Sequence, residues 1–281
     1  MAHRPYANSG LPSVTQVLSL LSAPGLPWGA ARETAKYAVH HLDQWQDLRP
    51  EDAVDTLYRH HRGVWDHRAM LGTALHQINA EWCQGHTVRV VDVIQELRAG
   101  SRLWRQMAET DIYRDLLPMA DGLARVWDRL QPVTLSWEQV VRFRGSAQGS
   151  HHVGLDYVGT TDWRAVLDGE PFLLDLKTTG NTKLGAGKYW DQWRLQLAAY
   201  RYCTEAVIYE GLEEKGTIEI PEVAGCVIVH LYGDGEFQVD GIQAGPAEHE
   251  IFLALRKAWA WRKQAEKTPG TGAPVIVGSP A

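Results

Sequence analysis

The sequence predicts an α/β protein with an enlarged helical N-terminal region. Residues from Ser13 to about Leu130 favour helices, strand-like segments begin near Thr134, and a helix over residues 190–203 precedes two further strand-like segments. The chain has 281 residues, of which 44% are hydrophobic and 22% are charged. It can therefore bury a sizeable core, as one large or two small domains.

The predicted elements follow one another in a regular order. Residues 1–12, with Pro5 and Pro12, read as an extended lead-in, and Ser13 is a good N-cap for the first helix. Helices are predicted at residues 13–21, 30–45, 51–62, 67–83, 88–97 and 112–130, the last one interrupted by Pro118. After the central strands, further strands are predicted at 223–232 and 236–241 and a last helix at 246–267. The tail, residues 268–281, is rich in Pro and Gly and is expected to be mobile.

Residues 159–177 form a predicted β-hairpin. Asp168-Gly169 is a strong signal for a two-residue turn between apolar-rich runs. A turn there pairs residues whose numbers sum to 337, so Asp162 lies opposite Asp175. Because side chains alternate along a strand, Asp175 and Lys177 share the face of Asp162, which is expected to carry the chemistry. The other face is expected to be core and carries Trp163, Ala165, Leu167, Phe172, Leu174 and Leu176. A longer loop near Glu170-Pro171 would shift this register and keep the hairpin.

Two carboxylates at this separation suit a hard cation. Like charges directly opposite each other destabilise a strand pair, so a positive charge is expected between Asp162 and Asp175. Magnesium and manganese take carboxylate and water ligands, and such an ion can activate water and stabilise charge on a phosphoryl oxygen. Lys177 would hold that water or the phosphate. The alternative is an exposed hairpin with scattered charges.

The segment after the hairpin adds polar groups to the same region. The helix over residues 190–203 places Gln196 and Tyr200 four residues apart and therefore on one face. These side chains could orient Lys177 and grip a DNA backbone, or Tyr200 could simply pack in the core. Lys183 and Lys188 flank the predicted site and are candidate DNA contacts, and Trp190 and Trp193 could stack on unpaired bases.

In this order, the motifs resemble those of the PD-(D/E)XK nuclease superfamily, in its RecB-like and phage-type exonuclease branch. That branch has an acidic residue on one strand, an Asp-x-Lys on the next, and a Gln-x-x-x-Tyr helix, matched here by Asp162, Asp175-Leu-Lys177 and Gln196-Leu-Ala-Ala-Tyr200. It also has a Gly-x-x-x-His pattern upstream, matched by Gly72-Thr-Ala-Leu-His76, and a glutamate on an earlier strand, for which Glu138 is the candidate. The superfamily proline is absent, because Thr161 precedes Asp162.

The resemblance implies a fold and a set of roles. It implies a restriction-endonuclease-like α/β core with a mixed central β-sheet flanked by helices. The whole chain would be one catalytic unit: a mainly helical region 1–131, a nuclease core 132–245, and a C-terminal helix and tail. The metal ligands would be His76, Asp162, Asp175 and the Leu176 carbonyl. Lys177 would position water, Gln196 and Tyr200 would support it, Glu138 would assist catalysis, and Thr178 would contact substrate.

Composition limits the remaining function classes. The net charge is −6, which does not indicate a nucleic-acid binder, although an acidic metal site contributes to it. Three separated cysteines, Cys83, Cys203 and Cys226, are too few for the iron–sulfur cluster that some relatives carry. The sequence has no secretory signal, no apolar run long enough for a membrane span and no framework of paired cysteines. We therefore expect the protein in the reducing cytoplasm.

The predicted function is therefore a magnesium- or manganese-dependent DNA exonuclease, which the resemblance associates with phage-type recombination or repair. Two alternatives stay open. One is a structure- or sequence-specific DNA endonuclease, and the other is a DNA-binding or recombination partner protein without turnover. A homo-oligomer, or a recombination or single-strand-binding partner, would be compatible with each, and no membrane partner is expected.

Overall fold

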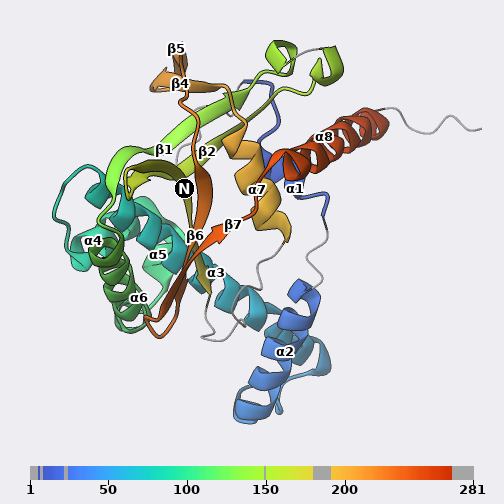
Figure 1. The fold of residues 1–281 in the computed structure, drawn as a ribbon. Coiled ribbons are helices and arrows are strands. Elements are labelled where there is room, and N and C mark those ends of the chain that lie inside the picture. The colour runs from blue at the N-terminus through green and yellow to red at the C-terminus, as the bar shows by residue number, and fades with distance from the viewer. Residues whose placement is uncertain (1–5, 7–8, 22–24, 149, 180–190, 268–281) are drawn as a thin grey trace, which may run out of the picture.

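The protein is built on a mixed, seven-stranded β-sheet with helices on both faces (Figure 1). The computed structural model describes residues 6, 9–21, 25–148, 150–179 and 191–267. The strand order is β5-β4-β1-β2-β3-β6-β7, in which β3 and β6 pair in parallel and the other neighbours are antiparallel. The α/β class and the mixed sheet flanked by helices are therefore confirmed. The C-terminal tail from residue 268, Lys183, Lys188 and Trp190 lie outside the described residues.

The N-terminal region is helical, as the sequence predicts. Its helices are α1 (Val14–Leu18), α2 (Gly25–His40), α3 (Pro50–Cys83), α4 (Val90–Gly100), α5 (Arg102–Gln106) and α6 (Glu109–Leu130). Ser13 caps α1 with a capping box that includes Gln16. The prediction of two helices at 51–62 and 67–83 was wrong, because α3 is continuous through Gly63. One glycine costs a helix only about 1 kcal/mol. Likewise, Pro118 lies inside α6 without ending it.

The strands that position the site are β1 (Val133–Phe143), β2 (Tyr157–Leu167) and β3 (Glu170–Thr179). The hairpin between β2 and β3 has the predicted register, because Leu167 pairs with Glu170 and Trp163 with Leu174. Asp168 and Gly169 both have positive φ angles, 49° and 87°, which a type I′ turn requires. The two-residue loop at Asp168-Gly169 is thus confirmed over the longer alternative.

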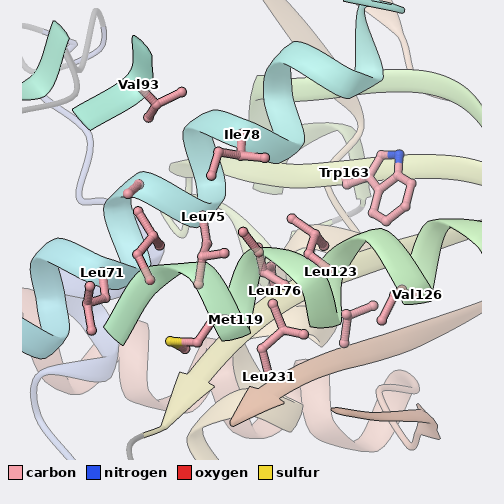
Figure 2. Close-up of a cluster of buried hydrophobic side chains, with 14 of the residues drawn as sticks. Leu71, Leu75, Ile78, Val93, Met119, Leu123, Val126, Trp163, Leu176 and Leu231 are labelled. Atoms are coloured by element: carbon pink, nitrogen blue, oxygen red, sulfur yellow. The ribbon is translucent and has the colours of Figure 1, made fainter. Parts of the chain in front are cut away.

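Two hydrophobic clusters, one on each face of the sheet, hold the fold together. The first joins α3, α4 and α6 to β2, β3 and β6, and Figure 2 shows its side chains, including Leu75, Leu123 and Leu176. The second joins α1, α7 (Asp191–Arg201) and α8 (Pro246–Lys267) to the other face, where Leu173 and Ile228 are buried. The predicted apolar face of the hairpin is confirmed. The other face, which was expected to carry the chemistry, also packs in part, because Leu173 is buried there against α7.

The remaining strands complete the sheet at its two edges. β6 (Gly225–Tyr232), β7 (Phe237–Ile242) and helix α8 agree with the prediction to within two residues at each end. The hairpin of β4 (Glu205–Glu210) and β5 (Glu213–Glu219) was not predicted, and neither was α5. Arg142 fixes the β4–β5 hairpin to β1, because its buried guanidinium donates to the carboxylates of Glu205 at 2.7 Å and Glu214 at 2.9 Å.

Among the described helices, none is both long enough and apolar enough to cross a membrane.

The buried His249 makes the stability of the fold depend on pH. Its Nε2 lies 2.9 Å from Tyr157 Oη, and the ring of Tyr202 stacks on it. Burial, followed by the nearby His152, lowers the pKa of His249 to about 4. The unfolded chain has a histidine pKa of about 6.5 and therefore binds more protons between pH 6.5 and 4. The stability that the neutral ring contributes is complete above pH 6.5 and is lost as the pH falls toward 4.

We expect the wild-type protein to lose about 2 kcal/mol of unfolding free energy through His249 between pH 7 and pH 5. Urea unfolding of wild type and His249→Gln at both pH values isolates this contribution as a difference. His86→Gln changes an exposed histidine and serves as the control. If the free energy of unfolding changes equally with pH in wild type and His249→Gln, His249 is not the source of the pH dependence.

Candidate active site

Three neighbouring strands and two helices bring the predicted site residues together. Glu138 lies on β1, Asp162 on β2, and Asp175 and Lys177 on β3. His76 projects from α3 on one face of the sheet, while Gln196 projects from α7 on the other. These residues span 121 positions of the sequence from His76 to Gln196, counted inclusively. Strand pairing and helix packing, rather than sequence proximity, create the cluster.

His76, Glu138 and Asp162 form an acidic cluster around one imidazole. The His76 Nδ1 atom lies 3.7 Å from Asp162 Oδ2 and 3.8 Å from Glu138 Oε1. One ligand atom from each of the three side chains lies within 4.8 Å of the other two. Burial by itself would lower the pKa of His76, but the carboxylates of Asp162 and Glu138 outweigh burial and raise the pKa to about 9. The cluster therefore attracts a positive charge strongly.

The backbone at Glu138 is strained in a way that only the structure reveals. Trp137 pairs with Trp163 and Gln139 with Thr161, so Glu138 lies across from Asp162. Its φ angle is 42°, in the left-handed region that non-glycine residues rarely occupy. Such strain costs on the order of 1–3 kcal/mol and collects at functional sites. The weakly matching glutamate of the sequence motif thus lies inside the cluster.

Asp175 is buried beside Asp162 and is paired with Lys177. Its side chain is only 2% exposed, and Lys177 Nζ lies 2.6 Å from Oδ2. Asp162 Oδ2 accepts a hydrogen bond from the backbone N–H of Leu176 at 3.0 Å. Burial raises the pKa of Asp175 to about 6, against the opposing effect of Lys177. Within the described residues, neither Asp175 oxygen accepts a hydrogen bond of good geometry. A buried carboxylate in this state is suited to a cation.

Lys177 is held by a chain of polar side chains from α7. Its Nζ donates to Gln196 Oε1 at 3.0 Å, and Gln196 Nε2 donates to Tyr200 Oη at 3.4 Å. Tyr200 is buried against Gly159 of β2, where a Cβ atom would lie 2.5 Å from the Tyr200 ring. Any larger residue at 159 would displace Tyr200. The structure therefore supports the orienting arrangement for Gln196 and Tyr200, with Tyr200 also packed in the core.

The predicted ligand set is arranged differently in detail. The set of groups close enough to share one ion contains Glu138, whereas Asp175 lies outside it and is directed at Lys177. For Leu176 the structure gives a role to the N–H group, and the ligand role of its carbonyl stays a prediction. Thr178 follows on β3, where its Oγ1 lies close to Gly72 of α3. Its contact with substrate is also a prediction.

One neighbour of Lys177 was missed by the sequence reasoning. His230 lies on β6 directly beside Lys177 in the parallel ladder, and its Nε2 lies 3.1 Å from Thr179 Oγ1. Trp193 of α7 contacts both, with its ring 5.4 Å from that of His230 and 6.0 Å from Lys177 Nζ. Burial lowers the pKa of His230 to about 4, so its ring is neutral at neutral pH. No local motif marks this histidine, because its position depends on a pairing between strands 53 residues apart.

The arrangement fits a hard divalent cation. The donor atoms are carboxylate oxygens and one imidazole nitrogen, a set that magnesium or manganese accepts. The raised pKa of His76 indicates excess negative charge at this point, from Asp162 and Glu138 above all. We conclude that the described residues are chemically able to hold such an ion.

Comparison with known proteins adds little to this geometry. No protein-family model matches the sequence, and no curated protein matches it significantly. Among solved structures, one similar chain is the crystal structure of SSO0001, with 16% sequence identity and a TM-score of 0.32. The alignment covers 69% of this chain and 86% of that chain.

Proposed function

We propose that the protein is a magnesium- or manganese-dependent deoxyribonuclease of the PD-(D/E)XK superfamily. The observation that supports this most is the meeting of Asp162 with Asp175 and Lys177 on adjoining strands, next to His76 from α3 and Gln196 from α7. The sequence motifs implied this group of residues. In the fold, His76 lies 3.7 Å from Asp162, and Lys177 lies 2.6 Å from Asp175 and 3.0 Å from Gln196. Metal-dependent phosphodiester hydrolysis is the chemistry that it supports best.

The side chains have distinct tasks in the proposed reaction. A bound divalent ion would supply Lewis acidity and lower the pKa of a bound water. His76, Asp162, Asp175 and Glu138 supply the negative charge and ligand atoms that hold it. Lys177, fixed by Gln196, places an ammonium group where a phosphate oxygen or the attacking water must be held. The Trp193 ring lies 6.0 Å from that ammonium group, where a cation–π attraction helps to hold it.

Exonuclease activity is the specific proposal. It rests on the Gln196-x-x-x-Tyr200 and Gly72-x-x-x-His76 matches, which resemble the exonuclease branch of the superfamily. DNA is then the partner, and a role in phage-type recombination or repair is the corresponding biological setting. Ring-like homo-oligomers and recombination partners remain compatible with this assignment.

Digestion of three DNA forms tests this function. End-labelled linear single-stranded and duplex DNA are incubated beside closed circular DNA with magnesium, manganese or chelator. We expect loss of the linear forms only, and only with metal. Cutting of the closed circle would replace the exonuclease assignment with an endonuclease. Absence of cleavage with either metal would contradict nuclease function for the isolated chain.

Gln196 is expected to act through Lys177. Gln196→Ala removes the acceptor of the Lys177 hydrogen bond, which is charge-assisted and worth about 1.5–3 kcal/mol. We predict a fall of about 10–100-fold in kcat, with little change in manganese affinity. Gln192→Ala, one turn earlier on α7, is the matched control, because Gln192 contacts the Leu21 carbonyl instead. Equal kcat values for the two variants would show that the hydrogen bond has no catalytic role.

A further inference from the structure

A cavity of about 490 Å³ adjoins the proposed active site at the end of β3. Its volume lies within the roughly 300–1,000 Å³ typical of small-molecule pockets. Helix α3 forms one wall, and α6, the end of β3 and the turn after β6 close it. The described lining residues are Val64, His67, Arg68, Ala69, Leu71, Asp115, Met119, Thr178, Thr179 and Gly233. None of these residues belongs to the proposed metal site.

The cavity and the metal site share two elements. On β3, Thr178 follows Lys177 by one residue, and because side chains alternate along a strand it lies on the face that α3 covers. On α3, Arg68 precedes His76 by eight residues, or about 12 Å along the helix. Gly72 lies between them and packs against Thr178. Gly72 is one turn, or about 6 Å along α3, from His76, so a phosphate at the metal site would have its attached sugar and base toward the cavity mouth.

The lining combines an apolar wall with fixed polar groups. Leu71 and Met119, both buried, extend the hydrophobic cluster to the cavity (Figure 2). Across from them, His67 Nε2 lies 2.7 Å from Asp115 Oδ2, and Arg114 Nε donates to Asp115 Oδ1 at 2.8 Å. Two partners hold the Asp115 carboxylate, so it is a fixed acceptor. Such a lining suits a planar, partly polar ring.

Arg68 supplies a planar cation at the same cavity. Its guanidinium is 3.9 Å from Glu33, beyond hydrogen-bonding distance, and its side chain is 42% exposed. A guanidinium plane stacks on nucleobases as well as on aromatic side chains. The cavity thus offers an apolar surface, hydrogen-bonding groups and a stacking cation within one small volume.

We propose that this cavity receives the base and sugar of one unpaired nucleotide whose phosphate lies at the metal site beside His76 and Asp162. A base can enter only when it has left its stack and its partner, which costs a few kcal/mol in duplex DNA and less at a frayed or single-stranded end. The enzyme then prefers single-stranded or frayed ends and removes one nucleotide in each cycle. This inference rests on the proposed nuclease function.

Binding without cleavage tests the cavity directly. Wild-type protein in chelator is titrated with two fluorescent single-stranded oligonucleotides, one normal and one with abasic residues at both ends. We expect the abasic oligonucleotide to bind about tenfold more weakly, since base stacking contributes about 1–3 kcal/mol per base. Equal affinities would overturn the proposal.

Two pairs of variants locate the effect. Ala69→Phe fills the cavity from an exposed helical position, and Ala258→Phe places the same ring on an exposed position of α8. We expect the affinity difference to disappear in Ala69→Phe and persist in Ala258→Phe. Arg68→Ala should reduce the difference several-fold, whereas Arg62→Ala, on the same helix but away from the cavity, should leave it unchanged. Persistence of the full difference in Ala69→Phe would place base recognition elsewhere.

Product analysis separates this inference from the proposed function. With manganese, wild type should release mononucleotides from single-stranded DNA, and Ala69→Phe should lose this activity at normal ends by about tenfold or more. If wild type and Ala69→Phe cleave DNA at the same rate and release products of the same size, the cavity proposal alone is contradicted. A wild-type protein that discriminates the bases but never cleaves would contradict the nuclease function alone.

Discussion

Replacing Lys177 with methionine is expected to lower the rate of DNA hydrolysis by about 10²–10³-fold, the usual effect of removing one group that stabilises developing charge. Methionine keeps the apolar stem of the side chain beside Trp193 and removes the ammonium that lies 2.6 Å from Asp175 and 3.0 Å from Gln196. The effect should appear in kcat. Single-turnover cleavage of labelled single-stranded DNA, with saturating manganese, measures it.

The fold should survive this substitution at neutral pH. Breaking a buried ion pair costs about 3–5 kcal/mol when it leaves a charge behind, but Asp175 already has a pKa raised to about 6 by burial. Loss of Lys177 raises that pKa further, so Asp175 takes up a proton and the buried charge disappears. Lys215→Met removes an exposed lysine of β5 that pairs with Glu213, and it is the matched control. Wild-type cleavage by Lys177→Met would refute the role of Lys177.

Manganese is expected to stabilise the wild-type protein and to lose most of this effect in Asp162→Asn. A ligand that binds only the folded chain stabilises it by about 2.7 kcal/mol at 100 times its Kd. Asparagine keeps the oxygen that accepts the Leu176 N–H and removes the charge that faces His76. Without metal, Asp162→Asn also loses the attraction of the Asp162 carboxylate for His76, so each variant's shift is measured against its own metal-free midpoint.

Thermal unfolding over a manganese titration measures this effect. His76→Ala should show an intermediate shift, because it removes one ligand atom and leaves the carboxylates. Asp121→Asn changes a carboxylate whose side chain is 76% exposed and should respond to manganese as wild type does. Equal metal-induced stabilisation of wild type and Asp162→Asn would exclude Asp162 as a ligand.

Much of the site could be predicted because its signals are local. The Asp168-Gly169 turn fixes the register of β2 on β3, and register places Asp162 near Asp175 without any tertiary information. Helical periodicity likewise puts Gln196 and Tyr200 on one face of α7. These are short-range geometric consequences of backbone structure, and the structure confirms them.

Other features depend on contacts that no local pattern encodes. His230 reaches Thr179 and the neighbourhood of Lys177 only because β6 pairs with β3 in parallel. The left-handed backbone at Glu138 is imposed by its position in the sheet, and glutamate has no preference for it. The cavity beside Thr178 requires α3, α6 and β3 together.

Manganese-edge anomalous scattering from a wild-type crystal soaked in manganese tests the central claim most directly. If these residues form a metal-dependent active site, a strong peak should lie within about 2.0–2.6 Å of carboxylate oxygens, among His76, Asp162 and Asp175. Glu138 or a second ion could complete that coordination. A crystal that shows manganese only at other positions, from a preparation that degrades DNA with manganese, would contradict the claim and place the catalytic centre elsewhere in the chain.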